Sequence, residues 1–249
     1  MTLFDFFREV PSAALAFSGG TDSAYLLWAA LRYKASVGVY YVNSAFQPAF
    51  ELEDARRLTQ ALGVTLRVLP ADILSCPEVA ANPADRCYHC KRQIFSQIAR
   101  AAQADGYRVV IDGTNASDDA AERPGMRALQ ELQVRSPLRE CGLSKEEIRL
   151  RSREAGLLTW NKPAYSCLAT RIPTGVPITA ALLERTERAE ARLAELGFSD
   201  LRVRSFHDCA RIQLPAGQLP RAVALREELL SALRPEYAGI LLDLEARQG

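Results

Sequence analysis

Short apolar runs and longer stretches with helical spacing alternate along the first half of the chain. Four runs have the length and composition of buried strands, and they span 13–17, 36–43, 64–69 and 107–112. After the first two runs, apolar residues recur every three to four positions, at 21–31 and at 51–62. Strands that alternate with helices predict an α/β fold with a doubly wound parallel sheet and right-handed crossovers.

A smaller α/β region is predicted in the last third of the chain. Helical spacing and strand-like runs follow one another at 179–196, 200–206, 210–214, 220–233 and 239–244. The segment before them, 160–175, contains Pro163, Pro173 and Gly175 and is predicted to be a loop. We therefore predict a first domain over 1–158 and a substrate-binding domain over 159–249 that includes this loop.

Two shorter patterns predict local structure only. Phe4, Phe6 and Phe7 indicate a short helix that packs on the sheet before the first strand. Ser144, followed three residues later by Glu147, is typical of a capping box at the start of a helix. We attach no catalytic role to this second helix.

Composition and charge argue against nucleic-acid-binding and membrane-spanning proteins. The chain has 249 residues, 48% of them hydrophobic, and a formal net charge of +1. A charge this close to zero argues against a broad nucleic-acid-binding surface. No apolar run approaches the roughly 20 residues that cross a bilayer, and the N-terminus lacks the basic start of a signal peptide. We expect a cytoplasmic protein with no membrane partner.

The segment 18–23, SGGTDS, lies between the first predicted strand and the first predicted helix. Adjacent glycines let the backbone approach a ligand, and the first turn of a helix favours an anion. The segment lacks the lysine of the phosphate loop G-x-x-x-x-G-K-[ST]. It resembles the PP-loop of the ATP pyrophosphatase family, which implies that it holds the β- and γ-phosphates of ATP. A glycine-rich turn without a ligand is the alternative.

Two other strand ends are expected at the same edge of the sheet. Asn43 ends the second strand, where we expect backbone groups to bind adenine. The segment DGTNASD, 112–118, follows the fourth strand, and Asp118 or Asp119 offers the hard oxygen ligands that Mg²⁺ prefers. Ordinary turn chemistry explains the same glycine and asparagine residues equally well.

Three arginines are expected on one face of the smaller domain's sheet. Arg202 and Arg204 lie two positions apart in one predicted strand, and Arg211 lies in the next. Guanidinium groups bind phosphate through a planar, bidentate fork. The three side chains indicate an anion site, although a solvated outer face is the usual explanation of charges on a strand.

Six cysteines in a chain expected in the cytoplasm indicate metal or sulfur chemistry, or core thiols, rather than disulfides. Cys87 and Cys90 form a C-x-x-C pair, and Cys167 lies in the predicted loop. Three thiolates suit a four-iron four-sulfur cluster with one open iron. They also suit zinc if Cys141 or Cys209 is the fourth ligand. Packing at a helix start is the simplest explanation of the pair.

Several segments occur together in a fixed order. They are the PP-loop, RCYHCK at 86–91, DGTNASD, SPLRECGLSKEEIR at 136–149, KPAYSCLATRIP at 162–173, and LRVRSF followed by ARI. The ordered set resembles the LarE family of ATP-dependent sulfur transferases, which help to build the nickel-pincer nucleotide cofactor. The resemblance covers about residues 14–212, and only the PP-loop is distinctive by itself.

The resemblance implies a reaction and the residues that perform it. ATP adenylates a carboxylate of a pyridinium dicarboxylate mononucleotide with release of pyrophosphate, and a protein-derived sulfur then displaces AMP to leave a thiocarboxylate. The residues expected to act in catalysis are Asp22, Cys167 and Arg171. The substrate phosphate is expected to bind Arg202, Arg204 and Arg211. Mg²⁺ is expected near Asp22, Asp118 and Glu190. ATP is expected at Ala16, Phe17, Ser18, Gly19, Gly20, Asp22, Ser23, Asn43, Gly113 and Thr114. The expected partners are a nucleotide-like small molecule and further copies of the chain in a homo-oligomer.

The resemblance leaves two sulfur sources open. In one, Cys167 attacks the acyl-adenylate and gives up its own sulfur, which leaves dehydroalanine. In the other, Cys87, Cys90 and Cys167 hold a four-iron four-sulfur cluster whose open iron carries a sulfide. Arg171, four residues after Cys167, is placed to lower the pKa of its thiol.

Three other functions share part of this pattern. A PP-loop tRNA thiolase also uses C-x-x-C and a third cysteine, but it needs a broad basic surface. An ammonia-dependent ligase of the NAD- or GMP-synthetase kind leaves the Cys167 loop unexplained. A cysteine–zinc interaction module on a nucleotide-binding scaffold is the non-enzyme alternative, and it would bind ATP without turnover.

Overall fold

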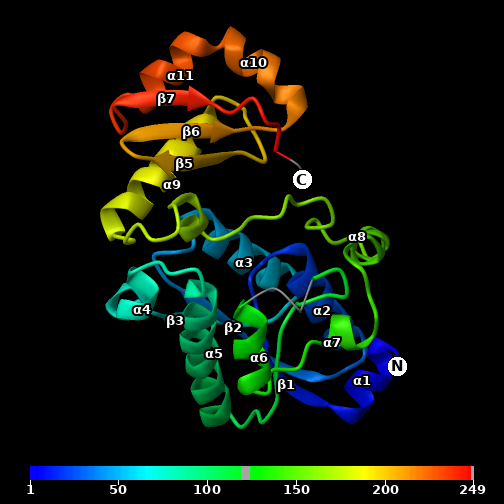
Figure 1. The fold of residues 1–249 in the computed structure, drawn as a ribbon. Coiled ribbons are helices and arrows are strands. Elements are labelled where there is room, and N and C mark those ends of the chain that lie inside the picture. Colours follow the sequence, from blue (N-terminus) through cyan, green and yellow to red (C-terminus); the bar gives the residue numbers. More distant parts are fainter. Residues whose placement is uncertain (119–123, 248–249) are drawn as a thin grey trace. The chain divides into compact units, whose positions relative to one another are not determined.

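The chain packs into two compact units (Figure 1). The computed structural model describes residues 1–118 and 124–247, and Asp119 lies outside these described residues. Unit 1 contains Met1–Ile73 and Asp85–Lys162, and unit 2 contains Leu74–Ala84 and Pro163–Gly249. The domain boundary between residues 158 and 159 stays a prediction about independently folding domains.

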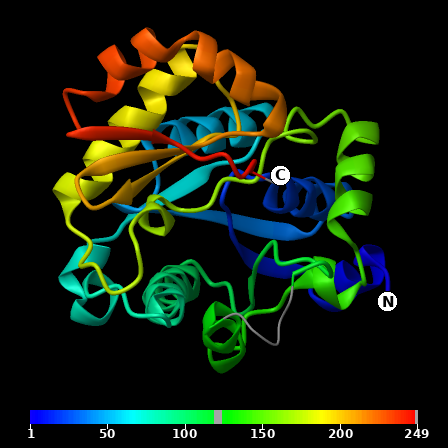
Figure 2. The same cartoon turned by 45° about the horizontal axis from the view of Figure 1, so that its top comes forward.

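A four-stranded parallel sheet with the order β3-β2-β1-β4 forms the centre of unit 1 (Figure 2). Its strands are β1 (Ser12–Ala16), β2 (Ser36–Asn43), β3 (Leu66–Pro70) and β4 (Val110–Ile111). The four predicted strands and their parallel direction are confirmed. β4 is shorter than the predicted 107–112. The Tyr107 amide donates to the Ala102 carbonyl at the end of α5, and its ring packs against Gly38, where a Cβ atom would lie 2.5 Å away.

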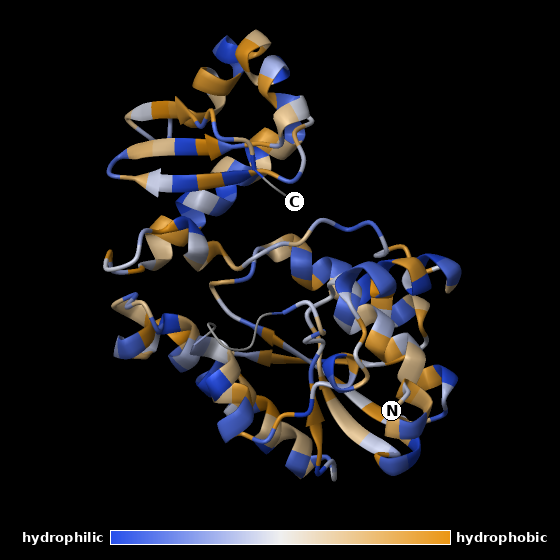
Figure 3. Cartoon of the chain, turned by 45° about the vertical axis from the view of Figure 1, so that its right-hand side comes forward, coloured by the Kyte–Doolittle hydropathy of each residue, from blue (hydrophilic) through white to orange (hydrophobic). Residues whose placement is uncertain are grey.

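Helices cover both faces of this sheet. They are α1 (Leu3–Glu9), α2 (Thr21–Arg32), α3 (Ala49–Ala61), α5 (Arg86–Ala104), α6 (Pro124–Glu131), α7 (Pro137–Glu140) and α8 (Lys145–Glu154). Ser144 caps α8 as predicted, since its hydroxyl accepts a hydrogen bond from the Glu147 amide at 3.2 Å. The predicted capping box is only half formed within the described residues, because the Glu147 carboxylate accepts from Arg151 and not from the Ser144 amide. Hydrophobic and hydrophilic residues lie next to one another along these helices (Figure 3), as amphipathic packing requires.

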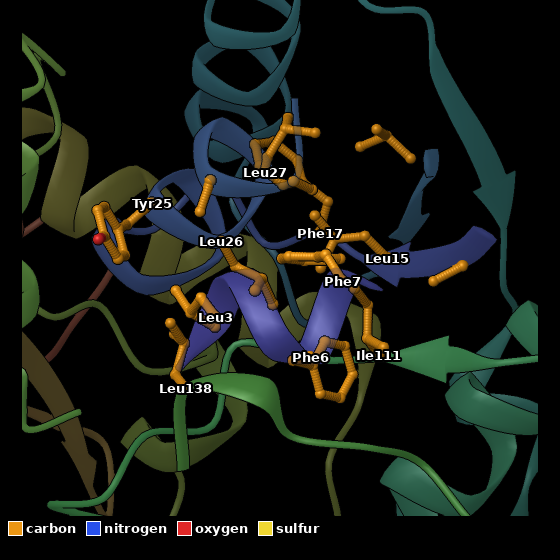
Figure 4. Packing of buried hydrophobic residues seen from close by; sticks show 14 of the residues in the cluster. Leu3, Phe6, Phe7, Leu15, Phe17, Tyr25, Leu26, Leu27, Ile111 and Leu138 are labelled. Atoms are coloured by element: carbon orange, nitrogen blue, oxygen red, sulfur yellow. The ribbon is translucent and has the colours of Figure 1, made fainter. Parts of the chain in front are cut away.

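Alternation along β1 divides the buried residues between the two faces. Ala13 and Leu15 belong to a core that includes α1 and α2, and Figure 4 shows Leu15 with Phe7 and Leu27 in this cluster. Ala14 belongs to a different core with α5. This division makes the sheet doubly wound, as the sequence predicts.

The N-terminal helix agrees with the prediction only in part. Phe6 and Phe7 are buried in the core of unit 1, whereas Phe4 is 52% exposed. Phe4 is expected from the sequence to pack on the sheet. Phe6 and Phe7, two and three residues later, occupy the face of this short helix that points into the core, so Phe4 does not. The Phe4 ring instead meets the edge of Tyr33, with ring centroids 5.6 Å apart.

Unit 2 contains a three-stranded sheet with the order β5-β6-β7, in which β5 and β6 are antiparallel and β7 is parallel to β6. Its strands are β5 (Arg202–Phe206), β6 (Cys209–Gln213) and β7 (Gly239–Leu242). Its helices are α4 (Pro77–Ala80), α9 (Ala180–Glu195), α10 (Leu219–Ala224) and α11 (Arg226–Leu233). The single helix predicted over 220–233 is wrong: Leu225, at φ −94° and ψ 31°, leaves helical geometry and separates α10 from α11.

Short 3₁₀ turns complete the chain. They are η1 (Ile73–Ser75), η2 (Leu168–Arg171) and η3 (Ala216–Gln218). Across the described ranges, every helix is too short or too polar to cross a membrane.

The segment Leu74–Ala84 is held within unit 2 by hydrogen bonds to residues far along the chain. The buried Asn82 side chain donates to the carbonyls of Pro173 at 2.8 Å and Val176 at 3.1 Å. Its own carbonyl accepts from the Gly175 amide at 2.8 Å. Unit 2 is therefore discontinuous in sequence.

Candidate active site

The SGGTDS segment forms a tight turn from the end of β1 into α2. Gly19 has φ +72°, and a Cβ atom there would lie 3.3 Å from the Cβ of Ala55 on α3. Gly20 is the N-cap of α2, and no side chain caps the helix there. The first-turn N–H groups of α2 have no acceptor within the helix. The glycine pattern thus produces a close, uncapped helix start that suits an anion.

Serine hydroxyls hold this turn in shape. The Ser23 hydroxyl accepts from the Ser18 amide at 3.3 Å and donates to the Gly20 carbonyl at 3.2 Å. The Ser18 hydroxyl accepts from the Gly20 amide at 3.3 Å and lies 3.1 Å from the Ser23 hydroxyl. Phe17 continues the sheet, because its amide donates to the Tyr40 carbonyl at 2.8 Å. Both serines therefore order the turn that would meet a phosphate.

Asp22 is the most unusual side chain of the turn. One carboxylate oxygen, Oδ2, accepts from the Lys145 ammonium at 2.5 Å. The other, Oδ1, is buried with no hydrogen-bond partner in the described part of the chain. Burial raises the pKa of Asp22, and the negative charge of Asp118 adds to the rise, while Lys145 opposes it. A buried acceptor left without a donor is costly, and a bound cation would remove the cost.

The oxygen ligands here fit Mg²⁺, which keeps several waters and uses one or two carboxylates together with substrate phosphates. Asp22 offers its unpartnered Oδ1, and the Asp118 carboxylate lies near enough to influence its pKa. Asp118 also accepts from the Asn115 amide at 3.0 Å. Groups of three or more metal-binding side chains are absent from the described residues, so phosphate oxygens would complete this coordination.

The predicted DGTNASD segment lies against the same turn. A Cβ atom on Gly113 would lie 2.9 Å from the Ser23 amide nitrogen, so only glycine fits without a shift. Asp112 is buried and accepts from the hydroxyls of Thr114 at 2.5 Å and Ser136 at 2.7 Å. The structure therefore brings Gly113 and Asp118 to the start of α2, as the sequence predicts.

Other predicted ATP contacts lie nearby in the fold. Ala16 is the last residue of β1. Asn43 is exposed at the end of β2, and its carbonyl accepts from the Ala71 amide at 2.9 Å. These positions are where parallel strands end, which is where ligands of such sheets bind. ATP contact at Ala16, Asn43 and Thr114 stays a prediction.

Sequence reasoning gave no role here to three cations. Lys145 was assigned only to a helix start, yet it pairs with Asp22. Lys162 lies 2.9 Å from an Asp54 oxygen and 3.4 Å from the Gly19 carbonyl. Arg149 donates to the carbonyls of Trp160 and Lys162, both at 3.0 Å. The Lys145 and Lys162 contacts span more than a hundred residues, and the Arg149 contacts join a helix to the loop that follows it, so none of them leaves a periodic signal in the sequence.

In unit 2, Arg171 and Glu190 form a buried ion pair that holds the cysteine loop. The Arg171 side chain is 0% exposed, and it bonds both Glu190 oxygens, at 2.8 and 3.1 Å. Burial lowers the pKa of Arg171, but hydrogen bonds and the charge of Glu190 raise it further, so the net shift is upward. Arg171 also donates to the Ser166 carbonyl at 2.7 Å. This arrangement anchors the residue just before Cys167.

The Glu190 carboxylate is fully occupied by donors. Besides Arg171, it accepts from the Val203 amide at 2.9 Å and from the Tyr165 hydroxyl at 2.7 Å. The structure therefore places Glu190 in the support of the loop, and its predicted role near Mg²⁺ stays a prediction. Cys167 is half-buried and is the N-cap of η2.

The three predicted arginines lie on neighbouring strands of unit 2, with Arg204 directly opposite Arg211. Arg204 donates to the Thr170 carbonyl at 2.6 Å, and Arg211 pairs with Asp243 at 2.6 Å. The Arg202 guanidinium has neither a hydrogen-bond acceptor nor an ion-pair partner among the residues that the structure describes, although the more distant charge of Glu190 acts on it. The Arg202 guanidinium is therefore the group of the three that is free to bind an added anion.

The charges around Arg202 are mostly positive. Burial lowers the pKa of Arg202 to about 10, and the charges of Arg247, Arg171 and Arg204 add to the fall. Arg247, which sequence reasoning missed, pairs with Asp200 at 2.6 Å. A half-buried guanidinium among other cations is stabilised when a phosphate binds. We call Arg202, Arg204, Arg211 and Arg247 the arginine face.

Cys87 and Cys90 lie at the start of α5, as its second and fifth residues, about one helical turn apart. Cys87 is exposed and Cys90 is half-buried. The Arg86 guanidinium lies 3.5 Å from the Cys87 sulfur. The two thiols belong to unit 1 and Cys167 to unit 2, so a shared cluster stays a prediction. As a donor set, accessible thiolates suit iron–sulfur clusters or zinc.

Comparison with known proteins gives three similar chains. An uncharacterized protein of Synechocystis sp. is 38% identical over 253 residues, which cover 99% of this chain and 93% of that protein. An uncharacterized protein of Methanocaldococcus jannaschii is 26% identical over 220 residues. No family model matches the chain.

The third relative has a named activity. It is the pyridinium-3,5-bisthiocarboxylic acid mononucleotide synthase of Lactiplantibacillus plantarum, 32% identical over 220 residues, which cover 88% of this chain and 80% of that protein. Identity at this level over most of both chains, together with the site geometry above, identifies the family. The chain belongs to the LarE family.

Proposed function

We propose that this protein is an ATP-dependent sulfur transferase that converts a carboxylate of a pyridinium dicarboxylate mononucleotide to a thiocarboxylate, in nickel-pincer cofactor biosynthesis. The observation that carries the proposal is the uncapped turn at Gly19 and Gly20, with Gly113 packed against it. The printed name of the Lactiplantibacillus relative describes a mononucleotide with two thiocarboxylates. Such a product requires a carboxylate to be activated and a sulfur to be added.

In the first step, a carboxylate oxygen of the substrate attacks the α-phosphate of ATP, and the bond to the β-phosphate breaks. The turn at Ser18–Ser23 would hold the leaving pyrophosphate through backbone N–H groups. Mg²⁺ held by Asp22 and Asp118 would neutralise charge on these phosphates. The Lys145 ammonium, 2.5 Å from Asp22, would orient that carboxylate.

In the second step, a sulfur nucleophile attacks the acyl carbon and AMP leaves. The mononucleotide phosphate would bind the arginine face, where Arg202 has no acceptor within the described residues. The Arg171–Glu190 pair would fix the loop that presents Cys167. Binding energy from a remote phosphate can thus position the reacting carboxylate.

Two sulfur sources fit this second step. If Cys167 is the donor, its Sγ forms a thioester as AMP leaves. Loss of the Cα proton to a base then breaks the Cβ–Sγ bond, so that the thiocarboxylate leaves with the product and dehydroalanine stays in the chain. If the donor is a cluster, Cys87, Cys90 and Cys167 would hold it, and it would supply an inorganic sulfide. The first source is used once per chain, and the second can be renewed.

Pyrophosphate exchange into ATP tests adenylation directly. With ATP, Mg²⁺ and the pyridinium dicarboxylate mononucleotide, we expect labelled pyrophosphate to enter ATP, and exchange should require the carboxylate substrate. Substrate-independent ATP binding without exchange would contradict the proposal and favour a nucleotide-binding module.

Iron analysis and intact mass then separate the sulfur sources. Protein purified without oxygen should contain about four irons if a cluster is present, and Cys87→Ala should lose them. A chain without iron whose mass falls by about one H₂S after one turnover identifies Cys167 as the donor. Zinc in place of iron, with no mass loss, would contradict both sources.

A further inference from the structure

Lys162 has no assigned role, yet its ammonium lies beside the turn that would hold ATP. Its Nζ is 3.4 Å from the Gly19 carbonyl and 2.9 Å from an Asp54 oxygen. The Lys162 side chain is only 19% exposed. A partly buried ammonium next to a phosphate-binding turn has two possible anionic partners, namely Asp54 and the nucleotide.

The backbone of Lys162 is fixed to the same part of unit 1. The Thr21 hydroxyl, in the first turn of α2, donates to the Thr159 carbonyl at 2.7 Å. Arg149 donates to the carbonyls of Trp160 and Lys162 itself. Because these contacts hold the base of the side chain, its four-carbon stem can move while its origin stays in place.

Asp54 can release Lys162 without losing its own compensation. Burial acts to raise the pKa of Asp54, but hydrogen bonds from Lys162 and Arg57 outweigh it, and the pKa is lowered. Arg57 bonds the other oxygen of Asp54. If the ammonium leaves, the partly exposed carboxylate keeps one cation, so it is not left without a counter-ion.

There is room for such a movement. Lys162, Asp54 and Arg57 line a cavity of about 620 Å³ in unit 1, together with Trp28 and Leu58. A lysine ammonium has three rotatable donors, so it can exchange a carbonyl and a carboxylate for phosphate oxygens.

We propose that Lys162 is a phosphate-binding residue that moves from Asp54 to the pyrophosphate part of ATP when the nucleotide occupies the Ser18–Ser23 turn. This inference rests on the proposed function, because it assumes that the turn binds ATP. In the absence of nucleotide, the ion pair with Asp54 keeps the Lys162 ammonium beside the turn. Lys162, which would bind phosphate, is also the residue at which the segment containing Cys167 begins.

Binding measurements on the full chain test this role. The probes are ATP, inorganic pyrophosphate and adenosine, each titrated by calorimetry with Mg²⁺ present. Lys162→Met should weaken ATP and pyrophosphate about 10- to 100-fold, as expected for a lost charge-assisted hydrogen bond. Adenosine affinity should not change. Arg56→Met, which removes an exposed arginine of the same helix, is the matched control, and its ATP affinity should stay within about twofold of wild type.

Asp54→Asn separates phosphate binding from a structural ion pair. If Asp54 competes with phosphate for the ammonium, this variant should bind ATP as tightly as wild type or up to about tenfold more tightly. A purely structural pair predicts that Asp54→Asn and Lys162→Met weaken ATP equally, and that result would overturn the inference. Thermal melts of each variant confirm that it is folded.

Tryptophan fluorescence gives a second readout. The chain has two tryptophans: Trp28 lines the cavity, and the Trp160 carbonyl is held by Arg149. Pyrophosphate should change the emission of wild type and not that of Lys162→Met. Failure of wild type to bind ATP would contradict the proposed function itself. Normal ATP binding by Lys162→Met would contradict the role of Lys162 alone.

Discussion

Two carboxylates, the buried Glu190 and the partly buried Asp22, differ in how many of their oxygens have hydrogen-bond donors. In unit 2, every Glu190 oxygen meets donors from Arg171, Tyr165 and Val203. In unit 1, Asp22 has one oxygen on Lys145 and the other buried with no partner among the described residues. The first arrangement is complete without a ligand and supports the fold. The second is incomplete, which is the condition expected of a binding site.

The arginines of unit 2 repeat this difference within one region. Arg171 is fully bonded, whereas Arg202 has no acceptor in the part of the chain that the structure describes. Substitution of the satisfied groups should therefore cost stability, and substitution of the unsatisfied groups should cost binding or catalysis.

Glu190→Ala should have the largest effect, on stability. It leaves the Arg171 guanidinium buried without its counter-ion, which typically costs about 3–5 kcal/mol. Urea denaturation should show this loss with or without Mg²⁺. A stability loss that appears only when Mg²⁺ is present would instead support the predicted metal role of Glu190.

Asp22→Asn should act on catalysis rather than stability. Pyrophosphate exchange should fall about 10²–10³-fold, the range for losing a preorganised electrostatic group. Stability near pH 7 should stay equal or rise, because the pKa of Asp22 is raised in the folded state and its ionisation therefore opposes folding above the unfolded pKa. A variant that unfolds as readily as Glu190→Ala would remove the distinction between the two groups.

Arg202→Met should weaken binding of the mononucleotide, or of inorganic phosphate as a probe, about 10- to 100-fold. In wild type, phosphate affinity should fall as pH rises through about 10, where Arg202 loses its proton. Calorimetry at several pH values checks this. Arg221→Met is a control, since Arg221 bonds the carbonyls of Leu196 and Gly197 and lies over the Phe198 ring, and it does not belong to the arginine face.

The same depressed pKa fixes the sign of a stability effect. The unfolded chain binds this proton more tightly than the folded chain, so the contribution of Arg202 to folding improves as pH rises from about 10. The free energy of unfolding of wild type should therefore rise relative to that of Arg202→Met as the pH increases above about 10, and the difference between them should become smaller. A constant difference would mean that the charge of Arg202 is not strained in the folded state.

Asp118→Asn should produce the smallest effect. Removing its charge should lower the pKa of Asp22, since the Asp118 carboxylate is one of the groups that raise it. Carboxyl-carbon NMR titration of Asp22 measures this shift. An unchanged pKa would mean that the two carboxylates do not share a site.

The sequence predicts the parallel sheet and the glycine turn because both depend on local patterns. Apolar runs locate β1 and β2, and Gly19 and Gly20 locate the turn. The same logic failed for 220–233, where helical spacing continues through Leu225 although the backbone does not. Helical periodicity indicates only which side chains face the core. Apolar residues of α10 and of α11 both face the core, so the pattern continues across the break between the two helices.

The partners of the site residues were not predictable from sequence. Lys145 and Lys162 contact residues more than a hundred positions away, and each lies in a segment with its own local explanation. Arg171 was expected near a reacting thiol, but its burial against Glu190 follows from tertiary packing. Residue type indicated the chemistry, and only the fold shows which charges are already compensated.

The discontinuity of unit 2 has a consequence for protein synthesis. Asn82 is synthesised about 90 residues before Pro173 and Val176, whose carbonyls its side chain bonds in the folded chain. The segment Leu74–Ala84, with the buried Val79, therefore cannot fold into unit 2 until the rest of unit 1 has been synthesised. Closing so long a loop is slow, and exposed apolar segments invite aggregation during the wait. Nascent chains stalled before Pro173 should therefore be the species that chaperones bind.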